Sequence, residues 1–182
     1  MTTTDPSTAT RLDGYRERRD HYFAHDPNSP LDEAQRAHFG GLTYFPERPD
    51  LVLDLPLATD GPGIGEVVPL ATADGSAKDF VRAGRVTFEL DGAPTTLAVF
   101  KEPERGRYFL PFRDGTAGTE TYAVGRYLDP RARPDGTLLV DFNYAYNPYC
   151  AYNHDGWTCP IPPRENVVPA RIEAGERAYH DE

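Results

Sequence analysis

Apolar residues in the first forty positions recur at helical spacing. Those between Leu12 and Phe23 fall near one face of an amphipathic helix. A second, shorter helix is expected after Ser29, with Ser29 as its N-cap, Pro30 in the first helical position and Gly40 just beyond its end. The pattern therefore predicts one or two helices at the N-terminal end of the chain.

Beyond residue 41 the pattern changes to short runs of β-branched and aromatic residues separated by turn residues. Val86, Phe88 and Leu90 alternate onto one face, and Asp91-Gly92 predicts a tight hairpin turn into the next strand. No alternation of strands with helices follows, which argues against a parallel sheet. The predicted strands are residues 51–55, 66–70, 85–90, 95–100, 107–112, 121–127 and 138–143, with a last one near 170–173.

These elements predict a mainly β fold, either an antiparallel barrel or a strongly curved sheet, with the helices packed at its N-terminal end. We expect a single domain over residues 10–182. The polar residues 1–9 lack an apolar period, and we expect them to form a disordered tail.

Charge and hydropathy exclude several functions. The chain carries 29 acidic and 19 basic residues, and its formal net charge of -10 repels nucleic-acid phosphates and anionic membranes. It has no apolar run long enough to span a bilayer and no leader pattern at its start. We therefore expect a cytoplasmic protein that binds neither nucleic acid nor membranes, with Cys150 and Cys159 as reduced thiols.

The most unusual segment covers residues 141–166. It contains four tyrosines, the one tryptophan, both cysteines and four prolines, over more than twenty residues with little predicted regular structure. Loops longer than about 12–15 residues are usually disordered or functional, and this aromatic composition is wrong for disorder. Its amide, phenol and thiol groups can form the polar wall of a binding site. The alternative is a structural loop that closes one end of a barrel.

The two cysteines in this segment permit several roles. Cys150 as a nucleophile would need His154 as its base. As metal ligands, Cys150, His154 and Cys159 are one short of a structural zinc site. A disulfide or redox pair is a third role, and two inert apolar side chains filling the loop are a fourth. We favour the inert role.

Several blocks of the sequence resemble one family. YNPYCAYN, WTCPIPPREN and AGER near the C-terminus, with FGGLTYFP and LPFRDGTAGTETYAVGRYLD upstream, are similar to the bacterial and archaeal family called domain of unknown function 1684. The resemblance covers nearly the whole chain except the tail. It implies no assigned biochemistry, but it implies that polar residues around 114–126 and 143–166 recur in the family.

A second polar block lies at residues 113–119, a glycine-rich turn between two predicted strands. Such a turn can present backbone N–H groups to an anion, or its Asp and Thr side chains can cap their own backbone. Arg126 could hold a carboxylate or phosphate through its planar fork, or form a structural pair with Asp141 or Glu165.

Together the two blocks favour a small-molecule site, binding or catalytic, in the mouth of a barrel. The alternatives are a protein-interaction module that uses the Tyr- and Trp-rich loop, and a metal-stabilised loop. The catalytic candidates are Asp114, Glu165 and Cys150. The ligand-binding candidates are Arg126, Asn143, Tyr146, Asn147, Tyr152, Asn153 and Trp157.

Overall fold

The computed structural model describes residues 10–179, so the predicted tail over residues 1–9 lies outside it. Two helices open the described chain, α1 (Arg11–His25) and α2 (Glu33–His38). Each begins with a capping box, in which the N-cap side chain, Thr10 or Asp32, accepts from a backbone N–H three residues on. One or two N-terminal helices were predicted, and the described residues contain two α-helices there.

The prediction that Ser29 caps the second helix is wrong. Its hydroxyl donates to the Phe23 carbonyl and its oxygen accepts from the Leu31 N–H, so it fixes the turn between the helices. The helix begins only at Glu33, because Asp32 is the residue placed to accept from the Gln35 N–H.

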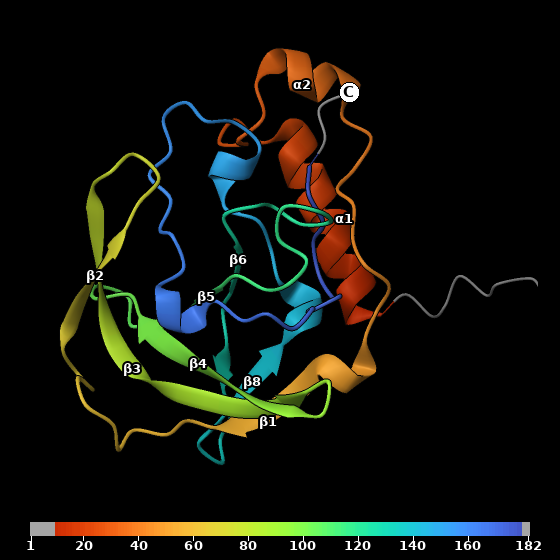
Figure 1. Cartoon of the computed structure of the whole chain (residues 1–182). Helices are drawn as coiled ribbons and strands as arrows, with labels where there is room; N and C mark the ends of the chain where they lie inside the picture. The colour runs from red at the N-terminus through yellow and green to blue at the C-terminus, as the bar shows by residue number, and fades with distance from the viewer. Residues whose placement is uncertain (1–9, 180–182) are drawn as a thin grey trace, which may run out of the picture.

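The strands form two antiparallel sheets (Figure 1). The larger has five strands in the order β2-β3-β4-β5-β6, and the smaller has three in the order β1-β8-β7. The larger sheet curls, and α1 packs on the opposite side of the molecule from β2. The predicted fold class, a mainly β protein with a strongly curved sheet and N-terminal helices, is confirmed. The strands are β1 (Val52–Pro56), β2 (Val67–Ala71), β3 (Ala77–Leu90), β4 (Ala93–Lys101), β5 (Tyr108–Phe112), β6 (Arg126–Leu128), β7 (Arg131–Ala132) and β8 (Thr137–Asp141).

Strand alternation gives the larger sheet two apolar faces. Leu110 and Leu128 point into the main core between the two sheets, whereas their neighbours Phe109 and Tyr127 belong to a second cluster on the opposite face. The hairpin from β3 to β4 turns at Asp91 and Gly92 as predicted, with φ of 51° and 76°. A third cluster joins the helices to the loop after β8.

Three strand predictions need correction. β3 begins at Ala77, eight residues before the predicted start, because Lys78 and Asp79 hide its alternation and a bulge at Gly84 interrupts it. Only Arg126–Leu128 of the region around residues 121–127 is a strand, and residues 170–173 form no strand. That last segment instead makes hydrogen bonds to the side chains of Asp114 and Arg126.

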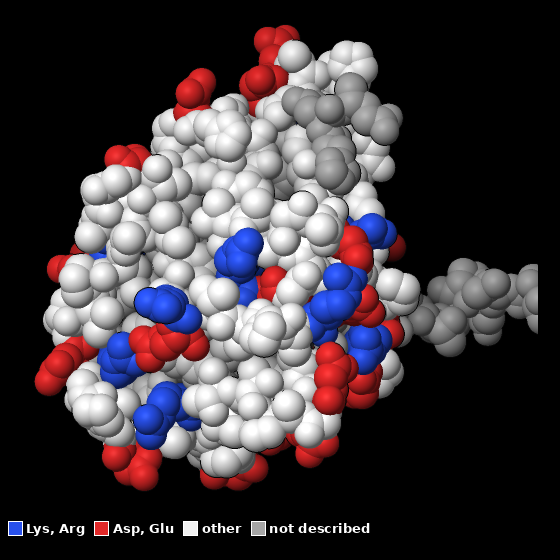
Figure 2. Space-filling view, viewed as in Figure 1, with Lys and Arg blue, Asp and Glu red and all other residues white. Residues whose placement is uncertain are grey.

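The surface carries mixed charge. On the face in Figure 2, basic and acidic side chains of the described residues alternate, and no extended basic patch is seen there. Within residues 10–179, no helix combines the length and apolar character needed to cross a membrane. Short 3-10 helices occur at Pro49–Leu51 (η2), Phe142–Tyr144 (η3), Tyr149–Ala151 (η4) and Arg164–Asn166 (η5).

Candidate functional site

The segment 146–161 crosses the second face of the larger sheet and is hydrogen-bonded to it at both ends. At one end Tyr146 exchanges two backbone hydrogen bonds with Tyr127 of β6. At the other, the Ile161 N–H donates to the Ala71 carbonyl, and the Cys159 carbonyl accepts from the Ala73 N–H. The loop is therefore a fixed cover over one end of the second apolar cluster.

A pocket of about 350 Å³ lies between this cover and the sheet. Its apolar wall consists of aromatic rings from both sides, and this volume falls in the range of about 300–1,000 Å³ typical of small-molecule sites. The pocket lies on the face of the sheet that carries the second apolar cluster, whereas the site was expected in the mouth of a barrel. The aromatic residues of the lining are Phe80, Tyr108, Phe109, Tyr127, Tyr146, Tyr149 and Trp157.

Asp129 supplies a carboxylate at the pocket wall. The Tyr146 hydroxyl donates to this carboxylate, at 3.0 and 3.1 Å from its two oxygens, while the side chain stays accessible to solvent. Loss of surrounding water raises the pKa of Asp129, and the Tyr146 hydrogen bond and the Arg107 charge only partly offset it. A second pocket of about 650 Å³ adjoins the first and shares Arg107, Tyr108, Asp129 and Tyr146 with it.

The arginines beside the pocket are already paired. Arg19 from α1 donates to Glu176 at 2.8 Å, and Arg107 contacts both oxygens of Glu102 at 3.1 Å. Asp129, in contrast, has no ion-pair partner within residues 10–179. The wall of the pocket thus presents one accessible carboxylate whose charge no salt bridge balances.

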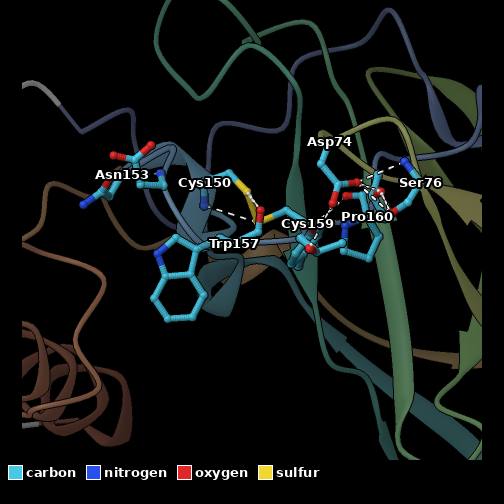
Figure 3. Close-up of a disulfide and its surroundings, with 11 residues drawn as sticks. Asp74, Ser76, Cys150, Asn153, Trp157, Cys159 and Pro160 are labelled. Carbon is cyan, nitrogen blue, oxygen red and sulfur yellow. Dashed lines mark hydrogen bonds between the residues drawn. A yellow bond between two sulfur atoms is a disulfide. The ribbon is translucent and has the colours of Figure 1, made fainter.

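Cys150 and Cys159 form a disulfide, so the expectation of reduced thiols is wrong (Figure 3). The bond joins η4 to the strand-like segment at Pro160, and the Trp157 ring extends away from it. Thr158 donates to Asp74 of the turn between β2 and β3, which ties the same segment to the sheet. A disulfide leaves no thiolate for the nucleophile or metal roles, and no cluster of three or more metal-binding side chains occurs in the described part of the chain.

We expect reduction of this disulfide to lower the free energy of unfolding by about 2 kcal/mol. The bond joins two residues nine positions apart, and breaking it gives the unfolded chain more conformational freedom. Urea unfolding with and without reductant measures the change. A Cys150→Ser, Cys159→Ser double variant is the control, and reductant should not alter its stability. Equal midpoints for the oxidised and reduced wild type would contradict the expectation.

Arg126 and Asp114 are buried and occupied by the protein itself. The Arg126 guanidinium pairs with Asp114 at 3.2 Å and donates to the carbonyls of Ile172, Ala174 and Glu176. Neither residue lines the aromatic pocket. The proposed role of Arg126 in holding a ligand anion is therefore wrong, and its structural partner is Asp114, not Asp141 or Glu165.

Some of the other candidates line the pocket, and the rest lie apart from it. Tyr146, Asn147 and Trp157 line the pocket, although the Asn147 amide is fully buried and donates to the Arg177 carbonyl. Asn143 bonds both backbone groups of Arg48. The remaining three lie apart from the pocket: Tyr152 packs on Phe23, Asn153 accepts from the Asp155 N–H, and Glu165 pairs with Arg82.

Asp129, Tyr127 and Phe109 are the site residues that the sequence analysis missed. Tyr127 and Asp129 are two apart at the end of β6, a spacing that places them on one face of the sheet. Because Leu128 points into the main core, its neighbours Tyr127 and Asp129 could have been assigned to the opposite face of the sheet. This signal went unused because the strand was predicted to end before Asp129.

The comparisons with known proteins agree with this description of the fold. Residues 37–177 match the family described as Protein of unknown function (DUF1684). The chain belongs to this family. It is also similar to an uncharacterized protein of Haloarcula marismortui solved by NMR in solution, with 34% sequence identity, 91% of each chain covered and a TM-score of 0.69. No curated protein shows significant similarity to the chain.

Proposed function

We propose that this member of the family binds a small organic molecule in the aromatic pocket. The observation that carries the proposal is the pocket itself, where rings from the sheet and the loop converge around one accessible carboxylate, Asp129. Enclosed apolar walls with a few directed polar groups are what small-molecule sites offer. The proposal keeps part of the expected site, since the pocket uses residues from both the 110–129 and the 141–166 segments.

The alternative of a protein-interaction module required the loop aromatics to lie on a flat surface with no cavity behind them. Tyr146 and Trp157 instead line a pocket, and Tyr152 is buried against α1. The metal-stabilised loop is contradicted by the disulfide. A cytoplasmic location remains a prediction, and a disulfide is more typical of oxidising compartments.

Trp157 is the only tryptophan of the chain, and it provides a fluorescence signal from the pocket wall. We expect compounds with one aromatic ring and one short polar arm to change this fluorescence in a saturable way. A panel should carry ammonium, hydroxyl and carboxylate arms, with calorimetry as the second readout. Failure of every compound to bind would overturn the proposal.

A variant pair locates the binding site. Thr158 is exposed and lines the pocket, so Thr158→Phe should narrow it and weaken binding by about tenfold or more, the cost of one lost apolar contact. Thr87→Phe is the control, because Thr87 is an exposed threonine on β3 that does not line the pocket. Equal weakening in both variants would show that the compounds bind elsewhere.

A further inference from the structure

We infer that the pocket selects organic cations, molecules with an ammonium or guanidinium group attached to an aromatic or apolar body. This inference rests on the proposed function and names the ligand class for the same site. The cationic group would bind at Asp129, and the apolar body would lie on the rings of Phe109 and Tyr127. Three observations support it.

The first is the balance of charge around the pocket. Arg19 and Arg107 are each engaged by a carboxylate, Glu176 and Glu102 respectively. In the described chain, Asp129 accepts hydrogen bonds from the Tyr146 hydroxyl alone. Each carboxylate oxygen can accept two hydrogen bonds, so Asp129 keeps acceptor capacity for a ligand.

The second observation is the direction in which two of the four phenol groups of the pocket donate, those of Tyr127 and Tyr146. The Tyr127 hydroxyl donates to the Pro160 carbonyl, and the Tyr146 hydroxyl donates to Asp129. Both hydrogens are therefore used within the protein. An ammonium group brings its own donors and meets an open acceptor, whereas a carboxylate would lie beside Asp129 and be repelled.

The third observation is the wall itself. Phe109, Tyr127 and Tyr146 form a continuous series of edge-to-face contacts, with ring centroids 4.8 and 5.8 Å apart. Faces of aromatic rings attract cations, and they do so more strongly where water is excluded. Asp129 forms no salt bridge in the described chain, so a positive ligand lying on these rings would also meet an unpaired carboxylate.

Lys78 is the one feature of the lining that points the other way. It is exposed at the start of β3 and has no ion-pair partner in the described chain. A ligand anion would be drawn to Lys78, not to Asp129. Lys78 therefore supplies the variant that separates the two ligand classes.

The test uses three probes that share one ring: phenethylammonium, phenethyl alcohol and phenylacetate. On the wild-type protein we expect phenethylammonium to bind about tenfold more tightly than the alcohol, the usual gain from one charge-assisted hydrogen bond. Phenylacetate should bind most weakly. Trp157 fluorescence and calorimetry give the dissociation constants.

The variants test which side chain is responsible. Asp129→Asn keeps an acceptor for Tyr146 and removes the charge, so it should reduce phenethylammonium binding to the level of the alcohol. Asp135→Asn, which changes an exposed aspartate beyond the pocket, should leave the preference intact. Lys78→Gln removes a cation from the lining and should not reduce the preference for phenethylammonium. The comparison of the three probes on the wild type stands even if a variant fails to fold.

The outcomes are distinct. Tightest binding of phenylacetate, lost in Lys78→Gln, would overturn the inference and assign the pocket to anions. Equal binding of the three probes, unchanged in Asp129→Asn, would overturn the inference and leave the proposed function standing. Binding of none of the probes would overturn both.

Discussion

The Arg126→Met variant is expected to lose about 3–5 kcal/mol of unfolding free energy, the cost of breaking a buried ion pair by removing one partner. The side chain is fully buried, and its guanidinium satisfies Asp114 together with three backbone carbonyls of the C-terminal segment. Methionine fills much of the volume but donates no hydrogen bonds. Three backbone carbonyls would then lose their guanidinium donor, and the buried Asp114 carboxylate would lose its counter-charge.

Urea unfolding followed by circular dichroism measures this loss. Arg105→Met is the matched control, since Arg105 is exposed in the turn between β4 and β5 and should change stability by less than about 0.5 kcal/mol. Arg126→Lys should restore little of the lost stability, because an ammonium cannot reproduce the planar array of N–H donors of the guanidinium. A loss below about 1 kcal/mol in Arg126→Met would show that the buried network is not what anchors this segment.

The Arg126 result bears on why several polar residues of the family blocks lie outside the pocket. Asn143 bonds both backbone groups of Arg48, and Asn166 bonds the Ala98 N–H and the carbonyls of Ala98 and Pro111. Segments without regular structure leave backbone groups that need partners, and buried amide and guanidinium side chains supply them. A polar residue in such a block can therefore be needed for folding. The sequence alone does not show whether its role is structural or functional.

The same reasoning explains the AGER block. Gly175 adopts a φ of 77°, and a Cβ there would lie 2.7 Å from the carbonyl oxygens of Phe142 and Ala145. Only glycine permits this approach, which delivers Glu176 to the interior beside Arg19. The AGER block therefore anchors the C-terminal end of the described chain to the protein interior.

Sequence reasoning succeeded where periodicity is local. Alternation identified both strands of the β3–β4 hairpin and the turn between them, and helical spacing identified α1. It found the Tyr146 and Trp157 side of the pocket because the loop composition is unusual. It missed the opposite wall, since Phe80 and Phe109 come from different strands and Asp129 directly follows a third. Sheet pairing, not the local sequence, makes these residues neighbours. The disulfide was considered but not favoured, because its formation depends on the distance between two loop segments.

Glu176 is expected to make the protein more stable in mild acid than in mild alkali. Complete burial raises its pKa from 4.5 to about 7, although Arg19 and the Asn147 amide both favour the charged form. The folded state therefore binds a proton more tightly than the unfolded state does. This contribution is fully present below the unfolded pKa of 4.5 and is lost as the pH rises through about 7. Its full size is about 3 kcal/mol.

The measurement is the difference in unfolding free energy between the wild type and Glu176→Gln at several pH values, since the difference removes the contribution of other groups. The wild type should lose about 2 kcal/mol relative to the variant between about pH 5.5 and about pH 8.5. Glu165→Gln, which alters a half-exposed carboxylate paired with Arg82, is the control and should show no such slope. If the wild type instead gains stability relative to Glu176→Gln as the pH rises, the Arg19 ion pair outweighs desolvation. Glu176 would then act as a charged anchor for α1 throughout the neutral range.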